Sequence, residues 1–96
     1  MIIFKIKPVD DVRESHKQGQ LNDVTKDQIN KILGFIPNST GDEDKVTAEW
    51  LFTVNGKECS IWDYKGSAEY DTFSFCGPRE IGEALFGIRF QPLYYR

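Results

Sequence analysis

The fold of this chain is decided by residues 47–64, which read TAEWLFTVNGKECSIWDY. Two runs rich in β-branched and aromatic residues flank Asn55 and Gly56. The Asn-Gly dipeptide readily adopts both left-handed backbone conformations of a type I′ turn, which joins antiparallel strands through a two-residue loop. The stretch therefore predicts a β-hairpin in which Val54 lies opposite Lys57.

The predicted register divides the hairpin into two faces, because side chains alternate across a strand. The more apolar face must be the core side, and it carries Ala48, Trp50, Phe52, Val54, Cys59 and Ile61. The second face is half polar, and it carries Thr47, Glu49, Leu51, Thr53, Glu58, Ser60, Trp62 and Tyr64. Leu51, Trp62 and Tyr64 are unusual on a solvated face. Either another part of the chain covers them, or they form an exposed patch that binds a partner.

Two helices are predicted, one on each side of the hairpin in sequence. Thr25 and Gln28 form a capping box at the start of the first helix, and Gly34 is placed to end it in a left-handed conformation. The second helix begins at Pro78, because proline suits the first helical position. Apolar residues then recur at helical spacing up to Gly87.

Two more strands are predicted from alternating side chains. The first covers residues 2–7 and ends at Pro8, which cannot donate a ladder hydrogen bond. The second covers residues 70–76, where Phe73 and Phe75 share one side and are expected to point into the core.

The remaining segments are predicted to be irregular. Residues 9–23 and 36–46 are polar and read as loops. The tail over residues 88–96 is too aromatic to be a frayed end, so it either covers the second face or belongs to the same patch. We expect one α+β domain over residues 1–96, in β-α-β-β-β-α order. It would have an antiparallel three- to four-stranded sheet with two helices packed on one face.

The composition argues against some classes of function. The net charge of −3 is unlike the basic surface on which binding to a phosphate backbone usually depends. Cys59 and Cys76 have opposite parity on their strands, so we expect reduced thiols, as in a cytoplasmic protein. The start of the chain lacks the features of a signal peptide and no run is long enough to cross a membrane, so a cytoplasmic location is predicted.

No set of residues has the spacing of a catalytic or metal-binding motif. His16 is a lone histidine in a polar stretch, and the acidic residues 42–44 lack the distal glutamate and spacing of an EF-hand loop. Cys59 falls on the core face, where a packed thiol is expected rather than an activated one. Asp63, at the end of its strand, is expected to cap a turn or pair with a cation. We therefore predict that the chain is not an enzyme and uses no metal or other cofactor.

The order helix, three strands, helix resembles that of the double-stranded RNA-binding domain. In that family the second helix opens with a cluster of lysines that contact phosphates across a groove. Here residues 77–81 read GPREI, with one base and one acid. Double-stranded nucleic acid is therefore not an expected partner.

A second resemblance is carried by the motifs WLFTVNG (residues 50–56), IWDYKGS (61–67), GP (77–78) and LFG (85–87). Over residues 24–87 the chain resembles small uncharacterised phage or prophage proteins. The resemblance implies no established activity. If a phage encodes the chain, a modulator or inhibitor of a host protein is the expected role.

These observations predict a small protein-binding module whose partner is a host protein or a second copy of the chain. Tryptophan and tyrosine are enriched among residues that dominate protein interfaces. The candidate binding residues are Leu51, Trp62, Tyr64, Lys65, Tyr94 and Tyr95. The alternative is a single-stranded nucleic-acid or nucleotide-binding domain that stacks bases on the same face. Glu49, Glu58 and Asp63 argue against it, because carboxylates beside the aromatic residues would repel phosphate.

Overall fold

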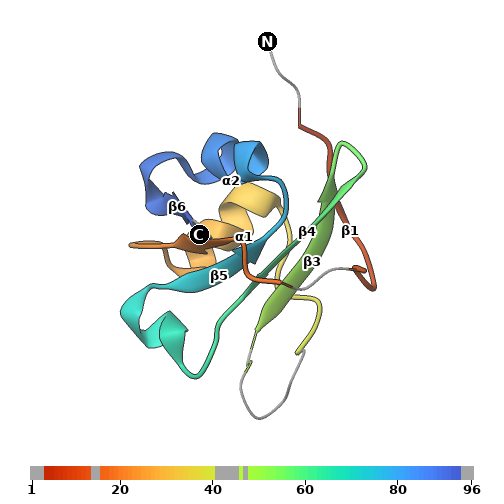
Figure 1. Ribbon diagram of the computed structural model, residues 1–96. Coiled ribbons are helices and arrows are strands. Elements are labelled where there is room, and N and C mark those ends of the chain that lie inside the picture. The colour runs from red at the N-terminus through yellow and green to blue at the C-terminus, as the bar shows by residue number, and fades with distance from the viewer. Residues whose placement is uncertain (1–3, 14–15, 41–45, 47, 94–96) are drawn as a thin grey trace.

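The computed structural model describes residues 4–13, 16–40, 46 and 48–93. This part of the chain contains β1 (Ile6–Pro8), β2 (Gly19–Leu21), α1 (Lys26–Leu33), β3 (Glu49–Val54), β4 (Lys57–Trp62), β5 (Phe73–Cys76), α2 (Arg79–Phe86) and β6 (Phe90–Pro92). Two short 3-10 helices, η1 (Ser67–Tyr70) and η2 (Gly87–Arg89), precede β5 and β6. The strands form an antiparallel sheet in the order β1-β3-β4-β5-β2-β6 (Figure 1). The predicted α+β class is confirmed, but the sheet has six strands rather than three to four.

The predicted hairpin is confirmed in both its turn and its register. Asn55 and Gly56 have φ angles of 53° and 83°, as a type I′ turn requires. Val54 lies opposite Lys57, and the pairing continues to the far end of both strands. The apolar face is the core side as expected, and its buried residues are Ala48, Trp50, Phe52, Val54, Cys59 and Ile61.

Both helices pack on the Trp50 face of the sheet. Thr25 Oγ1 accepts a hydrogen bond from the backbone N–H of Gln28, and Gln28 Oε1 accepts one from Thr25, which completes the predicted capping box of α1. Gly34 ends α1 with a φ of 88°. A single buried cluster contains side chains of both helices and of the sheet: Leu21, Val24, Ile29, Leu33, Trp50, Phe52, Val54, Cys59, Ile61, Phe73, Phe75, Ile81, Phe86 and Phe90.

The prediction of a loop over residues 9–23 is wrong at β2. This strand lies between β5 and β6 and pairs with both. Gly19 can belong to it because the Phe90 ring fills the space where a side chain would be: a Cβ on Gly19 would lie 2.4 Å from Phe90 Cε1. A three-residue strand that contains a glycine has too little alternation to be recognised.

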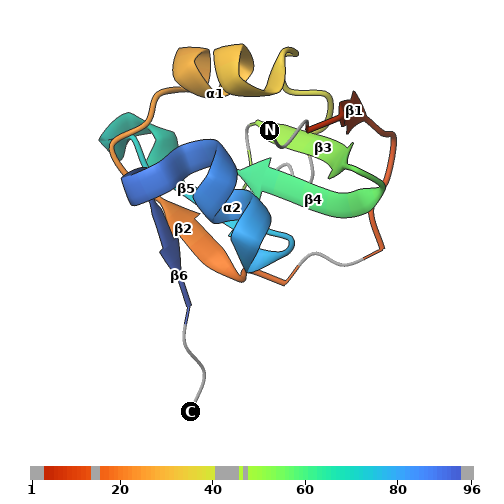
Figure 2. The same ribbon diagram turned by 90° about the horizontal axis from the view of Figure 1, so that it is seen from above.

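The described part of the tail forms an edge strand of the sheet, which neither alternative for the tail predicts. Phe90 is buried in the core on the Trp50 face, and residues 90–92 form the edge strand β6. Figure 2 places β6 and β1 at opposite edges of the sheet. The described part of the tail therefore neither covers Leu51 nor joins a patch with it.

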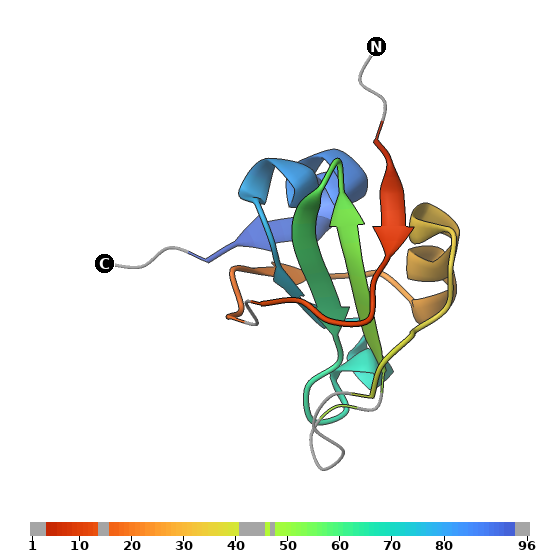
Figure 3. The same cartoon turned by 90° about the vertical axis from the view of Figure 1, so that its right-hand side faces the viewer.

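The second face is covered instead by residues 9–13 and 16–18, which we call the crossing segment. It connects β1, at one edge of the sheet, to β2 near the other edge. Figure 3 shows it passing in front of β3 and β4. Two hydrogen bonds hold its ends: Val9 N donates to Leu51 O at 3.0 Å, and Gln18 N donates to Phe75 O at 2.8 Å.

The residues beneath the crossing segment are buried. Leu51 is 6% exposed, Ser60 1% and Cys76 3%. Ser60 pairs with both of the others across the neighbouring strands, so the three form a row on the second face. Two of the three are small, which lets a backbone segment lie close to the sheet.

Both edge strands carry a proline that faces away from the sheet. The N–H of Val9 donates to β3, so alternation turns the nitrogen of Pro8 outward. The N–H of Leu93 donates to Gln18 O at 3.0 Å, so the nitrogen of Pro92 is turned outward in the same way. Because proline has no N–H, neither position can donate to an added strand.

Candidate functional site

A second row of residues crosses the second face beside the crossing segment. Each member pairs with the next across neighbouring strands: Gln91 with Gln20, Gln20 with Ser74, Ser74 with Trp62, and Trp62 with Glu49. We call these five residues the Trp62 row. Trp62 is half-buried and Ser74 is 5% exposed.

A pocket of about 410 Å³ opens over the Trp62 row. We call it the Trp62 pocket, and its lining residues are Lys17, Gln20, Trp62, Tyr64, Ser67, Thr72, Phe73 and Ser74. Among these described residues there is one cation and no carboxylate. The volume lies within the range of small-ligand sites, at roughly 300–1,000 Å³.

Tyr64 forms the outer wall of the pocket. It follows directly after β4, and its side chain is 44% exposed. Its backbone N–H donates to Ser67 Oγ at 3.0 Å, which fixes the turn that leads into η1. Lys65 Nζ lies 5.4 Å from the centre of the Tyr64 ring, close enough for a cation–π contact.

Lys17 and Gln20, which also line the pocket, belong to a chain of hydrogen-bonded polar side chains. Lys17 Nζ donates to Gln20 Oε1 at 3.0 Å, and Gln20 Nε2 donates to Asn22 Oδ1 at 2.8 Å. Asn22 Nδ2 in turn donates to Gln91 Oε1 at 3.4 Å. These contacts orient the Gln20 amide and hold the Lys17 ammonium at the rim of the pocket.

Two polar groups at the pocket have no hydrogen-bond partner among the described residues. Within the described part of the chain, neither the Ser74 hydroxyl nor the Trp62 indole N–H makes a hydrogen bond. Trp50 differs, since its Nε1 donates to Asn30 Oδ1 at 3.0 Å in the core. Ser60 Oγ also lacks a partner among the described residues, but it is buried away from solvent. Ser74 Oγ is accessible to solvent. Ser74 and Trp62 are therefore available to a ligand.

The structure brings together three of the predicted binding residues and separates a fourth. Trp62 and Tyr64 both line the Trp62 pocket, and Lys65 lies over the Tyr64 ring. Leu51 was expected in an exposed patch or beneath another part of the chain. It is buried under the crossing segment, so it does not belong to an exposed binding surface. Tyr94 and Tyr95 lie outside the described residues.

Sequence reasoning missed the other pocket residues. Lys17 and Gln20 come from a segment predicted to be a loop, and Ser74 comes from a strand whose polar side looked like ordinary solvated surface. Parity alone could have placed Ser74 on the second face with Cys76. Its pairing with Trp62 needed the strand register.

Of the three carboxylates that were expected beside the aromatic residues, only Glu49 is paired with Trp62. Asp63 is 1% exposed, and its Oδ1 accepts a hydrogen bond from Ala48 N at 2.8 Å, so it faces away from the pocket. Glu58 Oε2 accepts a bond from Arg13 N at 3.2 Å, in the crossing segment. Glu49 is the acid that pairs directly with Trp62.

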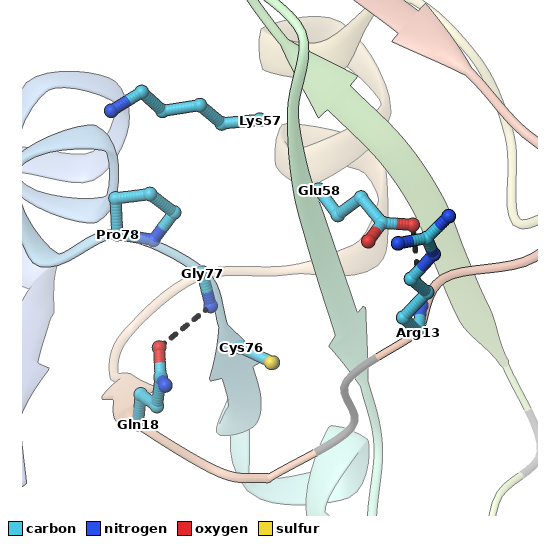
Figure 4. A pocket seen from close by; sticks show the side chains of 7 residues that line it. All are labelled: Arg13, Gln18, Lys57, Glu58, Cys76, Gly77 and Pro78. Carbon is cyan, nitrogen blue, oxygen red and sulfur yellow. Dashed lines mark hydrogen bonds between the residues drawn. The ribbon is translucent and has the colours of Figure 1, made fainter.

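A second pocket, of about 530 Å³, lies on the other side of the crossing segment (Figure 4). Its polar groups hold the segment in place: Gln18 Oε1 accepts a bond from Gly77 N at 3.1 Å, and Glu58 accepts one from Arg13. Figure 4 shows the Lys57 side chain directed toward Pro78 and away from Glu58. We interpret this pocket as a structural junction.

The Cys59 thiol next to this junction is not a reactive group. Cys59 and Cys76 are both buried, and they are not joined by a disulfide. Burial raises the pKa of the Cys59 thiol to about 12, and the nearby Cys76 adds to the rise. Because the thiolate is the nucleophilic form, a protonated Cys59 is inert at neutral pH.

The described residues contain no group of three or more His, Cys, Asp or Glu side chains that could hold a metal ion. None of the helices described has the length and apolar character that crossing a membrane requires. No protein-family model, curated protein or solved structure matches the chain.

Proposed function

We propose that this domain binds a protein partner through the Trp62 pocket and the aromatic side chains around it. One observation carries the proposal: the crossing segment covers Leu51 but leaves Trp62 and Tyr64 open beside unpartnered hydrogen-bond donors. Aromatic anchors next to a pocket are typical of the residues that dominate protein interfaces.

The sheet edges support recognition by the face rather than by strand addition. Each edge strand has a proline at one of its outward-facing positions, Pro8 in β1 and Pro92 in β6, and neither proline can donate a hydrogen bond to an added strand. A partner therefore gains side-chain contacts on the second face instead of main-chain hydrogen bonds at an edge. The resemblance to phage proteins makes a host protein the first candidate partner, and a second copy of this chain is the other.

Single-stranded nucleic acid or a nucleotide is the second candidate ligand of the same face. The positions of the carboxylates favour it, because none of the three expected to repel phosphate, Glu49, Glu58 and Asp63, is among the described residues that line the pocket. Base stacking on Trp62 and Tyr64, with Lys65 beside them, would supply the contacts. The net charge of −3 weighs against this candidate.

Panning a displayed random-peptide library tests the proposed function. The wild type is compared with the Trp62→Ser, Tyr64→Ser double variant, after thermal melts establish that both are folded. Tyr70→Ser is the matched control, since Tyr70 is 79% exposed and does not line the pocket. We expect peptides that the wild type and the control capture and the double variant does not.

Two further measurements separate the candidates. Sedimentation equilibrium of the same proteins decides whether the partner is a second copy, which requires self-association that the double variant loses. If no peptide depends on Trp62, and an oligonucleotide binds with an affinity that falls steeply with salt, the protein-binding proposal is wrong and the second candidate replaces it.

A further inference from the structure

We propose that the Trp62 pocket accepts a carboxylate, so that the partner contributes an acidic segment of polypeptide. This inference rests on the proposed function and adds the chemistry of the group that enters the pocket.

The donors at the pocket suit an anionic acceptor. The Ser74 hydroxyl is on a residue 95% buried, and it has no partner in the described part of the chain. The Trp62 indole N–H is also unpartnered, and indole nitrogen can only donate. Lys17 Nζ lies at the rim, held by its bond to Gln20. A carboxylate has lone pairs on both oxygens and no hydrogen to place, so it suits a pocket whose unpartnered groups can donate.

The local charge also favours an acid. The described lining contains Lys17 and no carboxylate, and Lys65 lies just outside it over the Tyr64 ring. At physiological ionic strength the screening length is about 8 Å, so these nearby cations act on a bound group more strongly than the net charge of the whole chain. Hydrogen bonds from such donors to an ionised acceptor are roughly twice as strong as those between neutral groups.

The walls distinguish a peptide carboxylate from a phosphate backbone. Trp62 and Tyr64 offer apolar surface against which the methylene groups of a glutamate can pack. A nucleic-acid strand needs cations spaced along its whole path. The five residues of the Trp62 row include no cation, so the row offers no such path.

Tryptophan fluorescence provides the test, because the two tryptophans of the chain differ in exposure. Trp62 lines the pocket, whereas Trp50 is 0% exposed and hydrogen-bonded in the core. The probes are pools of blocked hexapeptides in which one position is fixed as Glu, Asp, Gln, Asn or Lys and the others are randomised. We expect the Glu and Asp pools to bind about tenfold more tightly than the Gln and Asn pools. The fluorescence change should be absent in Trp62→Phe.

Two variants test whether Ser74 and Lys17 contact the carboxylate of the bound peptide. Ser74→Ala and Lys17→Gln are each expected to weaken the Glu pool about three- to tenfold and to leave the Gln pool unchanged. Lys17→Arg, which keeps the charge, should restore most of the loss. Lys26→Gln, on an exposed lysine of α1, is the control for removing one positive charge elsewhere. Lys17 is only partly buried at the surface, so its variants keep the test valid even if Ser74→Ala is unstable.

The outcomes separate this inference from the proposed function. If the Gln pools bind through Trp62 as tightly as the Glu pools, the carboxylate proposal is overturned while the peptide-binding function stands. If no pool binds, both fail. If AMP or a short single-stranded oligonucleotide quenches Trp62 and the acidic pools do not, the pocket takes a nucleotide and both are again overturned.

Discussion

Trp62 of β4 and Ser74 of β5 are directly paired across neighbouring strands, which sets a large aromatic side chain beside a very small one on the second face of the sheet. The difference in size leaves room above Ser74, and the Trp62 pocket occupies that room. The crossing segment covers the adjacent row, so the same face has a buried half and an open half.

Because one half of the second face is buried and the other half is open, we expect Leu51→Ala and Tyr64→Ser to lower the free energy of unfolding by different amounts. Leu51→Ala should lower the free energy of unfolding by about 2–4 kcal/mol, because it removes a buried side chain beneath the crossing segment. Tyr64→Ser should cost less than about 1 kcal/mol, because Tyr64 is 44% exposed. Urea denaturation of both variants measures the difference. Equal costs would mean that the open half of the face is covered as well.

Because the Phe90 ring lies against Gly82, we expect a small substitution in α2 to have a large effect on the stability of the fold. A Cβ on Gly82 would lie 2.4 Å from Phe90 Cε1, and a Cβ on Gly19 would meet the same atom at the same distance. Gly82→Ala should therefore destabilise the fold by about 1–3 kcal/mol, although alanine is the better helix former. The double variant Gly82→Ala, Phe90→Leu should lose much less unfolding free energy than the two single variants lose in total. Additive losses in chemical denaturation would show that the two residues are not coupled.

The raised pKa of Cys59 predicts a loss of stability at alkaline pH. The thiol has a pKa of about 12 in the fold against 9.0 as its ordinary value. Above about pH 9 the unfolded chain releases a proton that the folded chain keeps, so this contribution is complete below pH 9 and is lost as the pH rises toward 12. The slope is at most about 1.4 kcal/mol per pH unit. Urea unfolding should show the advantage of wild type over Cys59→Ala shrinking between about pH 8 and pH 10. An advantage that stays constant would contradict the assignment.

The prolines at the sheet edges predict a change in association. Pro92→Thr restores an N–H that points away from the sheet, so it should promote strand-to-strand association between copies. Gln91→Thr is the control, because alternation turns the N–H at that position toward β2. Sedimentation equilibrium should show more self-association for Pro92→Thr than for Gln91→Thr. The same distribution for both would mean that the proline does not protect this edge.

The elements that sequence predicted correctly are those with local signals. The Asn55-Gly56 turn sets the hairpin register, and the Thr25 capping box with Gly34 sets both ends of α1. These features depend on residues within a few positions of each other. The alternation that placed Trp62 and Tyr64 on the second face is local in the same sense.

The elements that were missed depend on distant parts of the chain. β2 is a strand because β5 and β6 pair with it, and Gly19 belongs there because Phe90 fills the space above it. The crossing segment likewise has no periodic pattern, and its path follows from β1 and β2 lying far apart in the sheet. The pocket joins residues from these segments to the hairpin, so only its aromatic half could be predicted from sequence.

The most direct test of the binding site is the ¹H–¹⁵N spectrum of the two tryptophan indoles during titration with the Glu-fixed peptide pool. Trp62→Phe assigns the two signals. The account predicts that the Trp62 indole signal shifts progressively, because its N–H gains an acceptor, while the Trp50 signal, already bonded to Asn30, stays in place. Peptide binding that leaves the Trp62 indole signal unmoved would contradict the assignment of the Trp62 pocket as the binding site.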